Sequence, residues 1–255
     1  MTQFSDTPGT SHWREPQGDP ARHAAPGGAR PWWRSPWATV ALAAVVIFNL
    51  FYALPRYLSF DPARSRVPLS PTFPEHWTIL VLHAVTGNIA LVTLLIQLTP
   101  WVRRNHPKVH RVSGRLYIFA GVLPGAGLAF VLLPYSTAPT GKLGLATMAT
   151  LWIFTTLMGY RYTLQHRYVE HRRWMLYSFA LALGTSWGRV YSQLMQHFPA
   201  LQFNIMIFLE LSSWLGWIVN LVIAQWWIEH TAARVSQQSL APGREAEPTL
   251  AASGR

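Results

Sequence analysis

The chain has 255 residues, of which 50% are apolar and only 12% charged, yet its formal net charge is +11. Soluble domains carry about 25% charged residues, and the 21 Lys and Arg are too few for a nucleic-acid binder. The chain contains no cysteine, which excludes disulfides, iron–sulfur clusters, zinc fingers and cysteine nucleophiles. This composition favours a protein whose main partner is the lipid bilayer.

The two ends of the chain differ from its middle. Residues 1–36 and 231–255 are polar and lack apolar periodicity, which predicts disordered tails on either side of a transmembrane domain at 37–230. A spanning helix needs about 20 mostly apolar residues. Six segments of the domain meet this requirement, namely 37–55, 77–101, 115–134, 143–160, 174–195 and 203–228. The expected fold class is all-α, a multi-pass integral membrane protein with six transmembrane helices in one bundle.

The short loops predict the orientation of these helices, because Lys and Arg collect on the cytoplasmic side. The loop after the second segment and the loop after the fourth are both basic, with Arg103, Arg104, Lys108, Arg111 and Arg115 in one and Arg161, Arg167, Arg172 and Arg173 in the other. Both loops fall on the same side as the two tails. We therefore expect both termini to be cytoplasmic.

Three titratable residues lie inside the expected spans: His83, Arg189 and Glu210. Each costs at least about 2.5–3.5 kcal/mol at the membrane centre, so each needs a partner or a function. At 1.5 Å per residue, all three fall in the outer half of the membrane. We expect Arg189 to pair with Glu210, with His83 close by and Asn49 as a further member. Such a group either fixes helix packing or binds a polar ligand or proton.

A second group of polar residues meets the cytoplasmic interface. Gln97 ends the second span, and basic and histidine side chains precede the third and fifth, including His110, Arg111, Arg115, His171 and Arg172. One interpretation is the positive-inside pattern together with contacts to lipid phosphates. The other is a pocket for an anionic group such as a lipid or isoprenoid headgroup, because Arg binds phosphate and carboxylate in a bidentate manner.

The histidines also allow a cofactor hypothesis. Two neutral imidazoles on facing helices can bind a b-type haem, and the candidate pairs are His110 with His171 and His83 with His197. Zinc is disfavoured, because the chain has no H-E-x-x-H motif. Nucleophile-elbow and P-loop motifs are absent as well, so no catalytic residues are expected and a non-enzymatic role is favoured.

An ordered set of motifs runs through the second to fifth segments. It consists of L-H-A-V-T-G-N-I-A-L from Leu82, Gln97, H-R-V-S-G-R-L-Y from His110, H-R-R-W-M from His171, and then Arg189. This set resembles the bacterial predicted membrane proteins grouped as domain of unknown function 2306, over about residues 78–194. The resemblance implies a multi-pass protein of the bacterial cytoplasmic (inner) membrane and supplies no activity. Glu210 and His197 lie outside the motifs that carry it.

The leading functional hypothesis is binding or movement of a small polar or anionic ligand through a bundle lined by histidine and arginine. Its candidate ligand-binding residues are His83, Gln97, His110, Arg111, Arg115, His171, Arg172, Arg189 and Glu210. One alternative is a membrane electron carrier with haem b, using the four histidines named above. Another is a structural or assembly role within a larger membrane complex.

Overall fold

The structure, a computed structural model, describes residues 36–198, 200 and 204–240, and every regular element within these ranges is helical. The longer helices are α1 (Pro36–Tyr57), α2 (His76–Leu98), α6 (Lys142–Leu164), α7 (Tyr168–Ala182), α8 (Thr185–His197) and α9 (Ile205–Leu240). The shorter elements are α3 (Pro100–Asn105), α4 (Pro107–Leu116), the π-helical η4 (Tyr117–Val122), α5 (Leu123–Leu132), and single 3-10 turns at Pro62–Arg64 and Leu133–Tyr135. The all-helical expectation is confirmed for this part of the chain.

Five helical segments of the described residues are long and apolar enough to cross a membrane. They are Thr39–Tyr57, His76–Leu98, Pro107–Tyr135, Lys142–Leu164 and Ile205–Thr231. These segments correspond to the first, second, third, fourth and sixth expected spans. Large apolar side chains remain exposed on them, as Phe51 (76%) and Val222 (63%) illustrate. Such exposure suits a protein whose outer surface contacts lipid.

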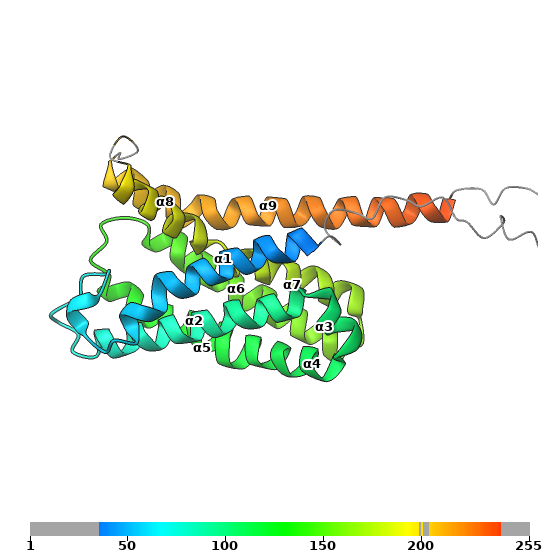
Figure 1. The fold of residues 1–255 in the computed structure, drawn as a ribbon, viewed down its shortest axis with the longest axis horizontal. Helices are drawn as coiled ribbons and strands as arrows, with labels where there is room; N and C mark the ends of the chain where they lie inside the picture. The colour runs from blue at the N-terminus through cyan, green and yellow to red at the C-terminus, as the bar shows by residue number, and fades with distance from the viewer. Residues whose placement is uncertain (1–35, 199, 201–203, 241–255) are drawn as a thin grey trace, which may run out of the picture.

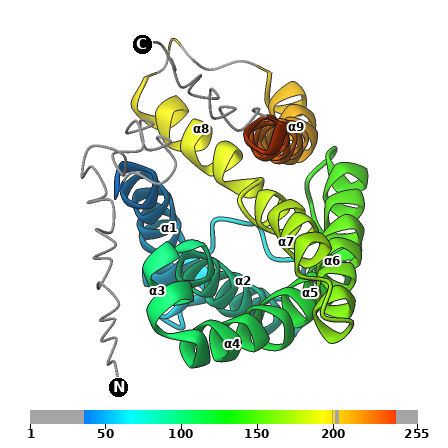
Figure 2. The same cartoon turned by 90° about the vertical axis from the view of Figure 1, so that its right-hand side faces the viewer.

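The fifth expected span is not one helix but two, because the backbone bends between α7 and α8. At the bend the Gly184 N–H bonds the Leu181 carbonyl at 2.9 Å, one residue short of the α-helical spacing. A Cβ on Gly184 would lie 2.7 Å from the Cβ of Trp217 in α9. Figure 2 shows α8 extending from α7 toward α1, against which it packs. A sixth membrane crossing by α7 and α8 together stays a prediction.

The two basic loops lie at the same end of the molecule (Figure 1). We call this end, formed by residues 99–116 and 161–173, the basic end. It is also the end at which α1 begins and toward which α9 runs. The connection 58–75 lies at the opposite end, which we call the loop end. The expectation that basic loops and chain ends share one side is thus consistent with the fold, while the side of the membrane that they face stays a prediction.

The C-terminal boundary of the helical region lies later than expected. α9 continues to Leu240, past the expected start of a disordered tail at 231. Residues 232–240 contain Ala, Arg, Gln and Leu, which are strong helix formers and prolong a helix that the membrane segment has already nucleated. The rest of that tail, 241–255, lies outside the described residues, as does residue range 1–35 of the N-terminal tail.

The core forms where α2 meets η4, and it depends on small residues. A Cβ on Gly121 would lie 2.9 Å from the Cβ of Ala90, so the two backbones approach each other closely. The π-helical turn precedes Pro124, which has no N–H to continue the α-helical ladder, and the Leu123 N–H bonds the Ile118 carbonyl. This extra residue per turn is the kind of local adjustment that a proline imposes on a membrane helix.

Four buried polar groups close a ring of hydrogen bonds in the middle of the bundle. Trp152 Nε1 donates to Tyr117 Oη at 3.1 Å, and Tyr117 Oη and Thr156 Oγ1 each lie 2.7 Å from Ser178 Oγ. Thr156 Oγ1 donates to the Trp152 carbonyl at 2.7 Å. Because an indole only donates and a carbonyl only accepts, the direction is fixed from Trp152 through Tyr117, Ser178 and Thr156 back to Trp152. We call these four residues the core ring, and every hydroxyl in it both donates and accepts.

Candidate functional site

Arg189 of α8 is held by a side chain of α1. Its Nη1 donates to Asn49 Oδ1 at 2.5 Å, and Asn49 Nδ2 donates to Ser186 Oγ at 3.0 Å and to the Val45 carbonyl at 2.7 Å. Asn49 is completely buried. The bend before α8 directs this helix toward α1 and so brings Arg189 to Asn49. The prediction that Asn49 joins the polar layer is confirmed.

A second arginine approaches the same place from the loop end. The Arg66 guanidinium carbon lies 3.9 Å from the centre of the Tyr52 ring, and that of Arg189 lies 5.9 Å from the same centre. Tyr52 Oη lies 3.2 Å from Ser192 Oγ of α8. Two positive charges therefore share the electron-rich ring of one tyrosine, an arrangement that stabilises each cation only modestly.

Two nitrogen donors in this region are buried and find no acceptor among the residues that the structure describes. They are Arg66 Nε and Gln193 Nε2. Gln193 lies one helical turn beyond Arg189, and therefore on the same face of α8. We define Asn49, Tyr52, Arg66, Arg189 and Gln193 as the arginine cluster. A buried donor without an acceptor costs about 1–3 kcal/mol, so the cluster is rich in donors and poor in acceptors.

The predicted pair between Arg189 and Glu210 is wrong. Glu210 Oε2 accepts from the Gly141 N–H at 2.8 Å, and Glu210 Oε1 accepts from Trp214 Nε1 at 2.9 Å. Gly141 has a positive φ of 85° and precedes the first turn of α6, so the carboxylate lies at the positive end of that helix. In the part of the chain that the structure describes, Arg189 makes no ion pair with a carboxylate.

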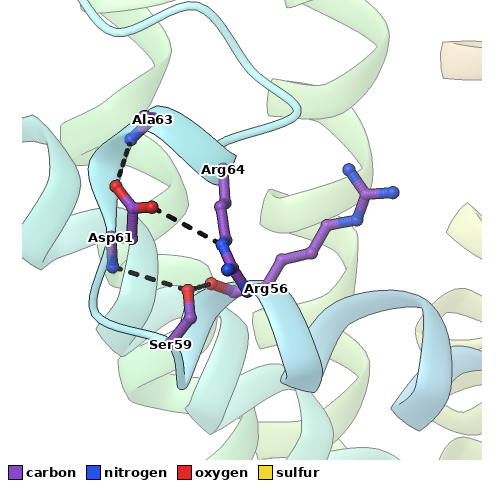
Figure 3. Close-up of polar contacts among 5 residues, drawn as sticks. All are labelled: Arg56, Ser59, Asp61, Ala63 and Arg64. Carbon is purple, nitrogen blue, oxygen red and sulfur yellow. Dashed lines mark hydrogen bonds and ion pairs between the residues drawn. The ribbon is translucent and has the colours of Figure 1, made fainter.

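Asp61, a carboxylate of the loop that carries Arg66, binds groups other than Arg66. Asp61 lies 3.5 Å from Arg64 Nε and accepts from the Ala63 N–H at 3.0 Å (Figure 3). Ser59 Oγ also accepts from the Asp61 N–H at 3.4 Å and donates to the Arg56 carbonyl at 2.6 Å. These local contacts stabilise the turn around the 3-10 segment and use Asp61. The ion pairs of the described residues join Arg66 neither to Asp61 nor to Glu75, the other carboxylate of this loop.

His83 lies beside the arginine cluster, as expected. Its Nδ1 is 2.9 Å from the Gly125 carbonyl on α5, and since a carbonyl only accepts, this nitrogen carries the proton. The ring also lies within electrostatic reach of Arg189. Of the predicted layer of His83, Arg189 and Glu210, with Asn49 as a further member, Arg189 and Asn49 are in contact, whereas Glu210 contacts the start of α6. Arg66, Tyr52 and Gln193 were missed, although the three-residue spacing of Asn49 and Tyr52 marks a polar face on the first span.

The polar residues of the basic end form separate contacts. Gln97 Nε2 donates to the His110 carbonyl at 2.5 Å and to Ser113 Oγ at 2.7 Å. His171 Nδ1 lies 2.8 Å from the Gly159 carbonyl and 2.6 Å from Thr163 Oγ1. His110 lies within electrostatic reach of His171, and its Nδ1 is buried without a partner. Gln97 thus orders the start of α4 near the two histidines.

The remaining candidates at the basic end are on the surface. Arg111, Arg115 and Arg172 are exposed, as expected for side chains that contact lipid phosphates. Arg167 and Glu170 form an exposed ion pair at 2.6 Å. The hydrogen bond from Arg167 lowers the pKa of Glu170 below its ordinary value.

The other predicted histidine pair is not formed. His197 ends α8, is exposed, and its Nδ1 contacts the Gln193 carbonyl at 2.8 Å, while His83 contacts α5. No group of three or more His, Asp or Glu side chains suited to a metal ion occurs in the described ranges. Of the two histidine pairs considered from the sequence, His110 and His171 lie within electrostatic reach of each other.

A family model whose description is "predicted membrane protein", domain of unknown function 2306, matches residues 80–228. The chain belongs to this family. No curated protein and no solved structure matches it. The match includes Glu210 and His197, which the sequence motifs alone left out, and it includes Arg189. Asn49 and Tyr52 of α1, which contact Arg189, precede the matched region, so the arginine cluster joins the family domain to the N-terminal helix.

Proposed function

We propose that this membrane protein binds a small anionic ligand at the arginine cluster. One observation carries the proposal: two guanidinium groups approach the same tyrosine ring, and the described residues supply neither with a carboxylate. A charge removed from water without a counter-ion is strongly unfavourable. An anion would supply that counter-ion, as Arg forms strong charge-assisted hydrogen bonds to carboxylate and phosphate.

The unpaired donors support the same ligand chemistry. Arg66 Nε and Gln193 Nε2 need acceptors. The oxygens of a carboxylate or a phosphate supply several acceptor positions, and neither group carries a positive charge that would repel the arginines. Asn49 is already saturated by its contacts with Arg189, Ser186 and Val45. The arrangement therefore favours a compact oxyanion over a cation or a large neutral ligand.

The proposal includes a position in the cell. We place the protein in the bacterial cytoplasmic membrane with six crossings, α7 and α8 forming the fifth, and with both termini cytoplasmic. The common location of the basic loops, the start of α1 and the C-terminal part of α9 supports this orientation. The loop end, and with it the arginine cluster, then faces the non-cytoplasmic side, from which the cluster would bind its anion.

Binding can be tested with the full chain in nanodiscs of uncharged lipid. Acetate, lactate, phosphate and sulfate are titrated while the unfolding temperature and the heat of binding are measured. We expect one class of oxyanion to bind and Arg66→Gln to weaken it about 10- to 100-fold, since a hydrogen bond to a charged group contributes about 1.5–3 kcal/mol. Arg64→Gln is the matched control, because Arg64 lies in the same loop but pairs with Asp61.

Two results would contradict this proposal. One is the absence of binding by every anion in the panel. The other is equal binding by wild type, Arg66→Gln and Arg189→Gln, which would place the anion elsewhere. Equal loss in Arg66→Gln and the Arg64→Gln control would indicate a general effect of surface charge.

Haem b binding between His110 and His171 is a second candidate function, favoured by the hydrogen bond of His171. Its Nδ1 donates to the Gly159 carbonyl, the contact that orients histidines which ligate metals through Nε2. When bound, a haem would supply one-electron chemistry. An optical spectrum of protein expressed with added haem precursor tests this. We expect a strong Soret band that is absent in His171→Ala, and a colourless wild-type protein would exclude the candidate.

A further inference from the structure

An open groove runs between α6, α7 and α9 on the side of the bundle away from α1. Its volume is about 560 Å³, within the range of small-molecule sites. Apolar side chains dominate the lining, among them Leu151, Phe154, Leu181 and Leu221. Phe154 is 50% exposed and Trp226 is 48% exposed, so the groove faces the surroundings of the helices. In a membrane-spanning bundle those surroundings are lipid chains.

One end of the groove carries a chain of polar contacts between α7 and α9. Arg173 Nε donates to Tyr177 Oη at 3.1 Å, Tyr177 Oη donates to Gln225 Oε1, and Gln225 Nε2 donates to Glu229 Oε1. The order of donors is fixed, because a guanidinium only donates and a carboxylate only accepts. The chain therefore begins at a positive charge and ends at a negative one, with two uncharged side chains between them.

Both charges remain accessible at this end. Arg173 and Glu229 are exposed, and the hydrogen bonds found in the described residues leave the Arg173 Nη groups and Glu229 Oε2 available. Trp174 and Trp226 also line the groove. Tryptophan collects at the depth of lipid headgroups, so the charged end lies where a headgroup would be and the apolar part lies where an acyl chain would be.

We infer that this groove binds an aminophospholipid with a zwitterionic headgroup. One acyl chain lies in the apolar part, the phosphate contacts Arg173, and the ammonium group contacts Glu229. An anionic lipid without an amine, such as phosphatidylglycerol, has no cation to offer Glu229, and phosphatidylserine adds a second carboxylate beside it. A choline headgroup has a cation but no N–H donor for a carboxylate. A primary ammonium has both the charge and the donors, so only that headgroup satisfies both ends of the polar chain.

This site is distinct from the arginine cluster in place and in ligand. It lies at the basic end and uses α6, α7 and α9, whereas the arginine cluster lies between α1, α8 and the loop end. Failure of anion binding at the arginine cluster would leave the lipid inference unaffected. The converse holds as well, so the two proposals are tested separately.

The test is lipid retention by the full chain in native mass spectrometry. The protein is purified in a mild detergent and offered dioleoyl phosphatidylethanolamine, phosphatidylglycerol and phosphatidylcholine at equal concentration. We expect the wild type to retain the ethanolamine lipid at least about fivefold over the other two. Glu229→Gln keeps the contact with Gln225 and is expected to lose that preference. Arg173→Gln is expected to lose retention of all three lipids.

Two matched controls lie at the same end of the molecule. Arg161→Gln removes an exposed charge and Glu170→Gln a partly exposed one, both outside the groove lining, and both variants should retain the wild-type preference. Equal retention of the three lipids by the wild type would overturn the inference. So would an unchanged preference in Glu229→Gln, or a loss of preference in the Glu170→Gln control.

Discussion

The core ring and the arginine cluster are both polar groups inside an apolar bundle, and they differ in how completely their donors are satisfied. In the core ring each hydrogen-bond donor has one acceptor, and the last acceptor belongs to the residue that starts the ring. In the arginine cluster the N–H donors outnumber the acceptors, and Arg66 Nε and Gln193 Nε2 have none. A closed set of bonds stabilises the fold by itself, while an open set of donors is suited to a ligand.

Removal of one hydroxyl from the core ring should give the largest effect. Tyr117→Phe leaves Trp152 Nε1 without an acceptor and Ser178 Oγ without a donor, in a place where both groups are buried. We expect a loss of about 2 kcal/mol in the free energy of unfolding, measured by reversible denaturation in detergent micelles. Tyr160→Phe is the control, and a loss of similar size in that variant would contradict the special role of the ring.

A substitution in the arginine cluster should raise the free energy of unfolding, whereas the substitution in the core ring lowers it. Arg66→Gln removes a charge for which the described residues supply no counter-ion, so without anion the variant should be more stable than wild type by about 0.5–1 kcal/mol, a typical gain when a functional residue is replaced. The same unfolding experiment measures it. A destabilisation as large as that of Tyr117→Phe would mean that the cluster is a structural element like the core ring.

Substitution of Glu210 can show whether its observed contacts or the expected pair with Arg189 determine its contribution to stability. Because its carboxylate lies at the N-terminus of α6, Glu210→Gln should cost about 0.3–1 kcal/mol. Combining it with Arg189→Gln should give additive changes within about 0.3–0.5 kcal/mol, as for independent sites. A coupling energy well above that value in the double-mutant cycle would restore the predicted ion pair.

The exposed pair of Arg167 and Glu170 should show the smallest effect. The pKa of Glu170 is lowered in the folded protein by the hydrogen bond from Arg167. The contribution of the pair to stability is therefore present above the unfolded-state pKa and lost as the pH falls through the folded-state pKa. In Arg167→Gln the NMR titration of Glu170 should move up toward the ordinary value. An unchanged titration would show that Arg167 does not cause the shift.

Much of the fold could be predicted from hydropathy, because the length and apolarity of a membrane segment are properties of consecutive residues. Five of the six expected segments appear as helices of the required length. The break in the other segment could not be predicted, because it depends on how Gly184 packs against Trp217 from a distant helix. Likewise, the continuation of α9 past residue 231 depends on an existing helix, while composition alone suggested a tail.

In the candidate site, too, the features set by one helix could be predicted and the contacts between helices could not. The helical rise per residue placed His83, Arg189 and Glu210 in one layer, with Asn49 as a further member, and the structure brings Arg189 and Asn49 into contact. The same reasoning gave the wrong partner for Arg189, because spacing identifies the polar face of a helix but not the neighbour that this face meets. The bend before α8 turns Arg189 toward Asn49, and Glu210 contacts the start of α6 instead.

The bend between α7 and α8 also separates two helices that we expect to differ in local stability. α7 buries five residues, including Ser178 of the core ring and Phe179, whereas Ser186 is the buried residue of α8. Segments with few buried contacts open without unfolding the whole protein. The amide hydrogens of α8 should therefore exchange with solvent faster than those of α7. An anion that joins Arg189 to Arg66 would slow this exchange by tying α8 to the loop end.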